Sequence, residues 1–122
     1  MSAVRVGARQ IGGGAPCFVA AEAGLNHNGD LALAHRLIDA AADAGADGVK
    51  FQNYRTEDFL QDRSLTYAYE SGGETVVESQ FEMFKRYELP SAALAELCAH
   101  CAERDVVFFS TPTSEQGVEE LV

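Results

Sequence analysis

The sequence predicts an α/β fold made of consecutive strand–helix units. Three short apolar segments, at residues 17–21, 48–52 and 106–109, have the length and composition of buried strands. A loop and a helical pattern of apolar residues follow each of them, and the third pattern has only begun at the last residue. Such an alternation forms either a (β/α) barrel or an open doubly wound sheet. A barrel needs about 250 residues, so we expect residues 1–122 to be one incomplete domain, the opening part of a larger fold.

The N-terminal segment is predicted to be a small hairpin followed by a flexible joint. Residues 4–11 alternate apolar and polar side chains on either side of Gly7 and Ala8, which is typical of two short strands. The three glycines at 12–14 do not form a phosphate-binding loop, because no lysine follows them and no strand precedes them in register. The strand at 17–21 is expected to end in a polar loop at 22–29.

The first helix has clear start and stop signals. Asp30 is a favourable N-cap residue, and Gly45 is the expected C-terminal stop. Between them, apolar residues recur at helical spacing and predict one buried stripe. The stripe consists of Leu31, Ala34, Leu37, Ile38, Ala41 and Ala42.

A long insert is predicted between the second and third strands. Residues 53–76 are expected to be irregular and residues 78–87 to form a short helix. Pro90 opens a further helix, whose apolar face is expected to include both Cys98 and Cys101. These two cysteines match C-x-x-C, but core packing explains them better than zinc because no second pair is present.

The end of the chain is predicted to begin another helix. Thr113 and Gln116 fit a capping box for a helix that follows the third strand. That strand and helix would be the start of the third unit.

Composition excludes several classes of function. The hydrophobic fraction of 47% supports a packed core, whereas the net charge of −10 argues against nucleic acid and anionic membranes as partners. No apolar run approaches the roughly 20 residues of a membrane span. The three cysteines and the absence of a secretory pattern favour the reducing cytoplasm.

Polar residues at the ends of the predicted strands form the candidate site. In α/β folds, ligands bind at the carboxyl ends of parallel strands. Side chains alternate along a strand, so Lys50 and Gln52 share one face. We expect Glu22 and Thr111 to converge with them around a pocket for an anionic, oxygen-rich substrate. The alternative is a buried ion pair between Glu22 and Lys50 that only orders the sheet.

The polar loop after the first strand allows two interpretations. The run from Asn26 to Gly29 has residues that hold a metal or a sugar hydroxyl, but a simple turn is the better interpretation of His27. The tyrosines of the insert, Tyr54, Tyr67 and Tyr69, either line a sugar site or pack the loop.

Four motifs in order then resemble the N-terminal part of the sialic acid synthase family. They are AEAGLNHNGD, LIDAAADAGADGVKFQ, ESQFEMFKRYEL and FFSTP. The family includes N-acetylneuraminate, legionaminate and pseudaminate synthases. The resemblance implies a TIM-type (β/α) barrel, of which this chain supplies roughly the first three βα units. It also implies a homodimer and a C-terminal antifreeze-like domain that is absent from residues 1–122.

The resemblance implies a condensation of phosphoenolpyruvate with an N-acetylated amino sugar such as N-acetylmannosamine. The products are a nonulosonic acid and phosphate, released by C–O cleavage. The cofactor implied is a divalent metal, Mn²⁺ or Mg²⁺, whose ligands are expected beyond Val122, so no metal ligand is assigned in this chain. Glu22 corresponds to a catalytic acid/base, and Lys50 to the lysine that meets the carboxylate or phosphate of phosphoenolpyruvate.

The remaining residues correspond to substrate-binding positions. Gln52 matches an amide of the substrate pocket, Thr111 matches a hydroxyl beside the phosphate, and Ser110 and Asn26 are expected nearby. Thr75 occupies the position at which some members use an asparagine to contact the sugar, so the preferred sugar is left open.

Two other classes of function compete with this interpretation. One is a Schiff-base aldolase that uses Lys50 as its nucleophile. The other is an inactive barrel fragment that binds a complementary piece, or dimerises, through two exposed sheet edges and one uncovered face.

We predict that the 122-residue chain alone is not a catalyst, because the resemblance places the metal ligands and a second phosphate-binding lysine beyond Val122. The measurement is phosphate release from phosphoenolpyruvate in the presence of N-acetylmannosamine and Mn²⁺. Sugar-dependent turnover by the purified 122-residue chain would overturn this prediction.

Overall fold

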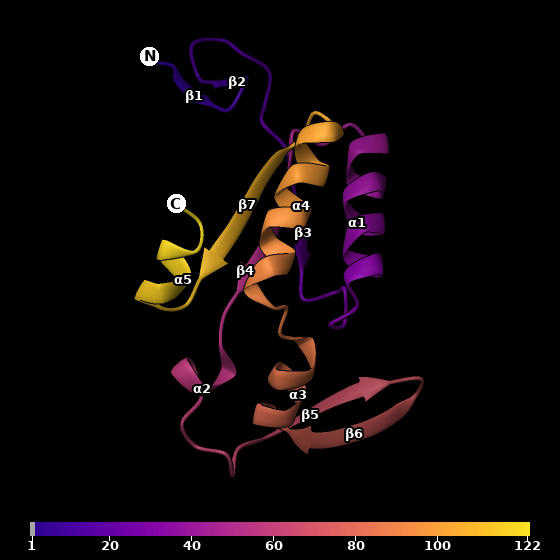
Figure 1. Ribbon diagram of the computed structural model, residues 1–122. Helices are drawn as coiled ribbons and strands as arrows, with labels where there is room; N and C mark the ends of the chain where they lie inside the picture. Colours follow the sequence, from indigo (N-terminus) through magenta and orange to yellow (C-terminus); the bar gives the residue numbers. More distant parts are fainter. Residues whose placement is uncertain (1) are drawn as a thin grey trace.

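The computed structural model describes residues 2–122 and shows a parallel three-stranded sheet with two helices on one face (Figure 1). The strand order is β3-β4-β7, so the strand that carries Lys50 lies in the middle. Two antiparallel hairpins, β1–β2 and β5–β6, lie at opposite ends of this unit. The α/β class predicted from the sequence is therefore confirmed, whereas closure into a barrel stays a prediction.

The elements follow one another in the order β1, β2, β3, α1, β4, α2, β5, β6, α3, α4, β7 and α5. The strands are β1 Val4–Val6, β2 Arg9–Ile11, β3 Ala20–Gly24, β4 Gly48–Asn53, β5 Thr66–Ser71, β6 Glu74–Ser79 and β7 Val107–Pro112. The helices are α1 Leu31–Asp43, α2 Thr56–Phe59, α3 Gln80–Tyr87, α4 Ser91–Glu103 and α5 Glu115–Glu119.

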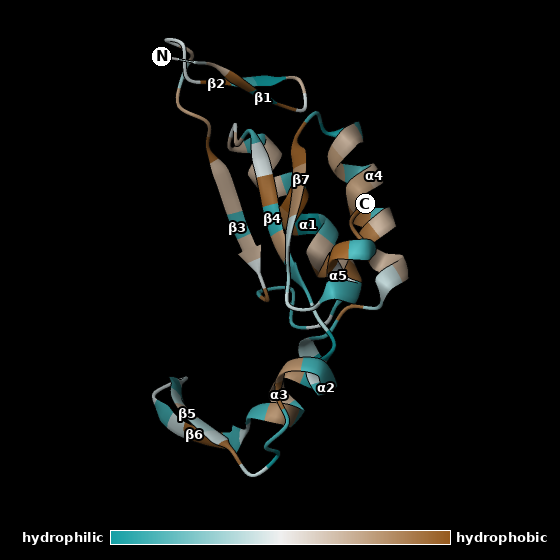
Figure 2. Cartoon of the chain, turned by 90° about the vertical axis from the view of Figure 1, so that its left-hand side faces the viewer, coloured by the Kyte–Doolittle hydropathy of each residue, from teal (hydrophilic) through white to brown (hydrophobic). Residues whose placement is uncertain are grey.

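Helices α1 and α4 lie side by side on one face of the sheet and enclose the core. In Figure 2 the strands lie on one side of the molecule and these two helices on the other. Ile38 of α1, Leu97 and Cys101 of α4, and Val49 and Phe51 of β4 are all fully buried. Each large apolar side chain contributes about 1.5–3 kcal/mol when it leaves water, so this contact fixes the helices on the sheet.

The start and stop signals of α1 are confirmed. The carboxylate of Asp30 accepts hydrogen bonds from the backbone amides of Ala32 (2.8 Å) and Leu33 (3.2 Å). Gly45 follows the helix with φ of +80°, the left-handed conformation that ends many helices. The predicted hairpin at 4–11 is also present, with Val4 paired to Ile11.

The first sheet strand begins later than predicted. It spans Ala20–Gly24 rather than residues 17–21, because its ladder with β4 starts at the pair Ala20–Gly48. Before that point, the amide of Val19 is hydrogen-bonded to the Asp47 carboxylate instead of to a neighbouring strand. Glu22 therefore lies within the strand and not in the following loop.

The prediction that residues 53–76 are irregular is wrong. The segment contains helix α2 and most of a two-stranded hairpin, β5–β6, whose turn is made by Gly72 and Gly73 with positive φ angles. The helix predicted at 78–87 starts at Gln80 because Glu78 and Ser79 still belong to β6. In Figure 1 the hairpin projects beyond the ends of the sheet strands.

Two local expectations near the C-terminus need correction. The N-cap of α5 is Ser114, whose hydroxyl accepts from the amide of Gly117 at 3.1 Å, and not Thr113. Cys101 is buried as expected, but Cys98 is exposed. Burial raises the pKa of the Cys101 thiol to about 11, which keeps it neutral and agrees with core packing.

Within residues 2–122, no helix has the length and apolar character needed to cross a membrane.

Two glycines with similar backbone angles provide a matched test of the fold. Gly29 has φ of +77° and Gly45 has φ of +80°. A Cβ at Gly29 would collide with the carbonyl oxygen of Arg86 in α3, whereas nothing lies within 4 Å of a Cβ at Gly45. We predict that both alanine variants lose about 1 kcal/mol to left-handed strain, and that Gly29→Ala loses a further ~1–3 kcal/mol to the clash.

The measurement is urea unfolding of both variants beside the unmodified chain. Equal midpoints for Gly29→Ala and Gly45→Ala would show that the contact between the β3–α1 loop and α3 is not tight.

Candidate functional site

A charged pair and a hydroxyl meet at the carboxyl ends of the three sheet strands. The ammonium of Lys50 in β4 lies 2.6 Å from Oε2 of Glu22 in β3. It also donates a hydrogen bond of 3.2 Å to Oγ1 of Thr111 in β7. The central strand thus brings residues from both neighbours together, as the sequence predicted for these three side chains.

The register of the sheet explains this convergence. Lys50 is directly opposite Glu22, and Gln52 is directly opposite Thr111. Val49 and Phe51 are fully buried against the helices, so alternation directs Lys50 and Gln52 to the other face. Gln52 is half-buried on that face, two residues beyond Lys50.

A bulge in β3 shapes the position of Glu22. Glu22 pairs with Lys50 and Gly24 pairs with Phe51, which leaves Ala23 as an extra residue. Gly24 has φ of +52°, and a Cβ there would lie only 3.3 Å from Oε1 of Glu22. Such bulges bend a strand and redirect a side chain, so the glycine leaves the space that the carboxylate occupies.

Lys50 is less buried than the sequence suggested. Its side chain is 36% exposed and that of Glu22 is 52% exposed. Ion pairs in such surroundings contribute about 0–1 kcal/mol, so this pair is not a buried strut that holds the sheet together. An ammonium group has three donors, and two of them point at Glu22 and Thr111.

Ser110 does not join this group. It follows Phe109 and precedes Thr111, so its side chain lies on the opposite face, and its hydroxyl donates a 2.8 Å hydrogen bond to Oδ1 of Asn53. Asn53 was not singled out from the sequence. The available signal was a polar residue at the end of a buried strand.

Asn26 and Thr75 also lie outside the charged group. Asn26 is in the loop after β3 and donates from Nδ2 to the carbonyl of Ala23 at 3.1 Å. Thr75 is in β6, near the turn of the projecting hairpin, and its hydroxyl donates to Glu70 at 2.6 Å. Any contact of these two residues with a substrate stays a prediction.

One cavity of about 510 Å³ lies between the β3–α1 loop, α3 and the start of β5. Its lining combines carboxamides with aromatic and apolar side chains and includes no charged residue. The residues are Leu25, Asn26, Asn28, Tyr67, Gln80, Met83, Phe84 and Tyr87. Tyr67 therefore lines a cavity, whereas Tyr54 packs against Phe59 and Phe84.

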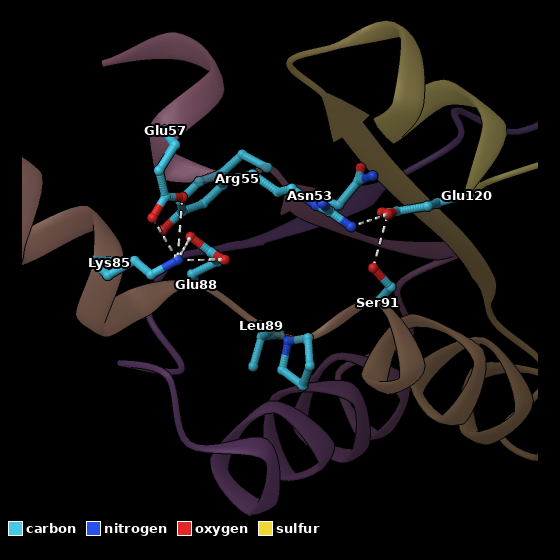
Figure 3. A pocket seen from close by; sticks show the side chains of 10 residues that line it. Asn53, Arg55, Glu57, Lys85, Glu88, Leu89, Ser91 and Glu120 are labelled. Carbon is cyan, nitrogen blue, oxygen red and sulfur yellow. Dashed lines mark hydrogen bonds and ion pairs between the residues drawn. The ribbon is translucent and has the colours of Figure 1, made fainter. Parts of the chain in front are cut away.

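Another cavity, of about 360 Å³, lies beyond the end of β4 and is rich in charges (Figure 3). Lys85 of α3 bridges Glu57 of α2 (3.1 Å) and Glu88 (3.2 Å). Arg55 faces Glu120 at 3.8 Å. Two cations and three carboxylates are paired here, and the pairs connect segments that are distant in sequence.

His27 is fully buried in the β3–α1 loop, beside the ring of Phe51. Its Nδ1 accepts a 3.0 Å hydrogen bond from the amide of Gly29, so the proton of the neutral ring is on Nε2. Nε2 is buried and has no partner within residues 2–122. The prediction of a turn is confirmed, and His27 is a core residue of that turn.

The described residues do not fit a metal site. Among residues 2–122, no group of three or more histidine, cysteine, aspartate or glutamate side chains is arranged to hold an ion. The metal implied by the resemblance therefore has no ligand set here, and we assign no chemical step to it.

Comparison with protein families and curated proteins gives a consistent result. The model of the NeuB family matches residues 37–122. The N,N'-diacetyllegionaminic acid synthase of Campylobacter jejuni is 40% identical over 104 residues, which are 85% of this chain and 31% of that protein. The spore coat polysaccharide biosynthesis protein SpsE of Bacillus subtilis is 36% identical over 121 residues, 99% of this chain and 32% of that protein. The chain thus spans about a third of the length of the curated relatives it matches.

A solved structure supports the same assignment. The N-acetylneuraminic acid (sialic acid) synthetase of Leptospira borgpetersenii, crystallised with citrate, is similar with a TM-score of 0.80 and 33% identity. The match covers 98% of this chain and 37% of that chain.

His27 gives a prediction for the dependence of stability on pH. Burial lowers the pKa of His27 below its ordinary value, whereas in the unfolded chain it titrates near pH 6.5. The neutral His27 ring therefore makes its full contribution to the free energy of unfolding above about pH 6.5. This contribution is lost as the pH falls, by up to about 1.4 kcal/mol per pH unit. We predict that His27→Asn, whose Oδ1 is bonded to Cγ as Nδ1 is and can accept from Gly29, flattens the profile below about pH 6.5. The free energy of unfolding, measured by urea titration at several pH values, tests this, and parallel profiles would contradict it.

Proposed function

Because this chain belongs to the NeuB family, we propose that the protein containing it condenses phosphoenolpyruvate with an N-acetylated amino sugar. The products are a nonulosonic acid and inorganic phosphate. In this proposal the three parallel strands are the first strands of a TIM barrel, and the complete protein works as a homodimer. The names of the relatives support a synthase of this class, with the individual sugar left open.

The observation that carries the proposal is the position of the Lys50 ammonium between Glu22 and Thr111. It lies at the carboxyl ends of the strands, where α/β enzymes bind their ligands. A fixed cation with a spare donor suits the carboxylate or phosphate of phosphoenolpyruvate, and the Thr111 hydroxyl beside it suits a phosphate oxygen. Because the sheet holds the charge in place, little reorganisation accompanies binding.

The proposed reaction divides into two bond-forming steps and one cleavage. The methylene carbon of phosphoenolpyruvate forms a bond to the aldehyde carbon of the open-chain sugar, and the aldehyde oxygen takes a proton from water. Water then adds to the resulting oxocarbenium carbon and loses a proton to the carboxylate of Glu22, which acts as a general base. The C–O bond to phosphate breaks, phosphate leaves with the bonding electrons, and the remaining hydroxyl loses its proton to give the ketone.

The other predicted residues take secondary roles in the proposal. Gln52 is placed beside Thr111 to bind substrate oxygens, and Asn26 and Thr75 are proposed to approach the sugar from the loop and the hairpin. Ser110 was predicted as a substrate ligand, but its hydroxyl is engaged by Asn53. A divalent metal, Mn²⁺ or Mg²⁺, is expected to supply Lewis-acid polarisation of the aldehyde from ligands outside these residues.

The geometry favours the synthase over a Schiff-base aldolase. A Schiff base requires Nζ of Lys50 to attack a carbonyl carbon, whereas Nζ is engaged by the carboxylate of Glu22 at 2.6 Å and by the hydroxyl of Thr111 at 3.2 Å. The synthase uses that ammonium as a charge and forms no imine.

We predict that the full-length protein releases phosphate from phosphoenolpyruvate only when an N-acetylated amino sugar and Mn²⁺ are present. N-acetylmannosamine and a diacetamido-sugar would be compared. Lys50→Met is expected to reduce kcat/KM by about 100-fold or more, because it removes a charge-assisted contact to the anion.

The matched control is Lys85→Met, since Lys85 is also paired with carboxylates but lies in the charged cavity beyond the end of β4. It should leave kcat/KM nearly unchanged. Borohydride treatment with a keto acid should not trap Lys50. Trapping at Lys50, or the absence of phosphate release by well-folded protein, would reject the synthase proposal.

A further inference from the structure

The buried side chain of Asn53 connects the end of β4 to the end of β7 and to α5. Asn53 is 5% exposed and lies on the helix side of the sheet, opposite to Lys50. Its Nδ2 donates to the carbonyl of Gly117 at 2.9 Å, and its Oδ1 accepts from the hydroxyl of Ser110 at 2.8 Å. A carbonyl can only accept, so Gly117 determines which end of the carboxamide faces it.

These two bonds add to the strand ladder at its last pair. Asn53 is in register with Pro112, which has no amide hydrogen to donate. The side chain of Asn53 therefore ties the end of β7 to β4 in addition to the backbone pairing. Thr111 lies between Ser110, which is bonded to Asn53, and Pro112.

Helix α5 is fixed by the same contact. With five residues it is too short to be stable by itself. The amide of Gly117 is bonded to Ser114 and its carbonyl to Asn53. A Cβ at Gly117 would lie 3.2 Å from both Nδ2 of Asn53 and Cβ of Pro112, so only glycine allows this close approach without displacement.

We infer that Asn53 is a positioning residue that sets the Thr111 hydroxyl against the Lys50 ammonium. It does so by holding Ser110 and Gly117 on the far side of β7, without touching the substrate. This inference rests on the proposed function, because it assigns the Lys50–Thr111 pair to the binding of phosphoenolpyruvate. It also gives Ser110 a structural role, because its hydroxyl connects β7 to the side chain of Asn53.

The test compares variants of the full-length protein that contains this chain. Asn53→Leu and Ser110→Ala are expected to raise KM for phosphoenolpyruvate about tenfold, the effect of weakening one hydrogen bond to an anion. Ser110→Thr keeps the hydroxyl and should restore most of the affinity. Thr56→Val is the control, because Thr56 is also fully buried just after β4 but donates its hydroxyl to Glu88 and not to β7.

A double variant separates positioning from general stability. If Asn53 acts through Thr111, Asn53→Leu combined with Thr111→Val should bind no worse than Thr111→Val alone, within about twofold. Additive losses in the double variant would overturn the inference, as would an equal rise in KM for Thr56→Val. Ser110→Ala provides the same comparison if Asn53→Leu does not fold.

Calorimetric titration with phosphoenolpyruvate alone distinguishes this inference from the proposed reaction. If the wild-type protein binds phosphoenolpyruvate but releases no phosphate with any sugar, the reaction is rejected while the affinities of the variants still test Asn53. If the wild-type protein does not bind phosphoenolpyruvate, both are rejected.

Discussion

The alternation of side chains along β4 is the constraint on which the rest of the structure depends. Val49 and Phe51 are fully buried against α1 and α4, and their burial fixes which face of the strand is turned outward. Lys50 is consequently presented on the opposite face, and the parallel register brings Glu22 and Thr111 to it from the neighbouring strands. The burial of the apolar face of β4 thus determines where the polar face of the same strand lies.

This arrangement separates stability from chemistry. The Glu22–Lys50 pair is too exposed to add much to folding, and the core beneath it supplies the rigidity. Lys50 can therefore give up its contact with Glu22 for a contact with an incoming anion at little cost to the stability of the fold. The side chain of Lys85 is exposed to a similar extent, so its pairs with Glu57 and Glu88 also add little to folding, although they connect α2 with α3.

The sequence predicted the parts of the fold whose signals are local. Asp30, Gly45 and the apolar stripe between them defined α1, and apolar composition defined β4. The hairpin β5–β6 was missed because its strands are mixed in polarity, although Gly72-Gly73 is a typical two-residue turn. Strand register is a tertiary property, so the start of β3 was misplaced.

The same reasoning explains what was and was not foreseen at the site. Glu22, Lys50 and Thr111 were grouped correctly because they lie on one face of three adjacent strands. Ser110 was grouped with Thr111 although adjacent residues of a strand face opposite ways. Asn53 was overlooked because its importance depends on Gly117, which is 64 residues away in sequence.

The extra residue in β3 has a consequence for how such a chain can diversify. Because the bulge at Ala23 lies after Glu22, the pairing of Glu22 with Lys50 is set before the strand enters the loop. Changes in length or composition beyond Gly24 can therefore alter the wall of the neighbouring uncharged cavity without shifting the carboxylate from one face of the sheet to the other. The bulge thus marks the boundary between the Glu22–Lys50 pair and the loop whose residues line the uncharged cavity.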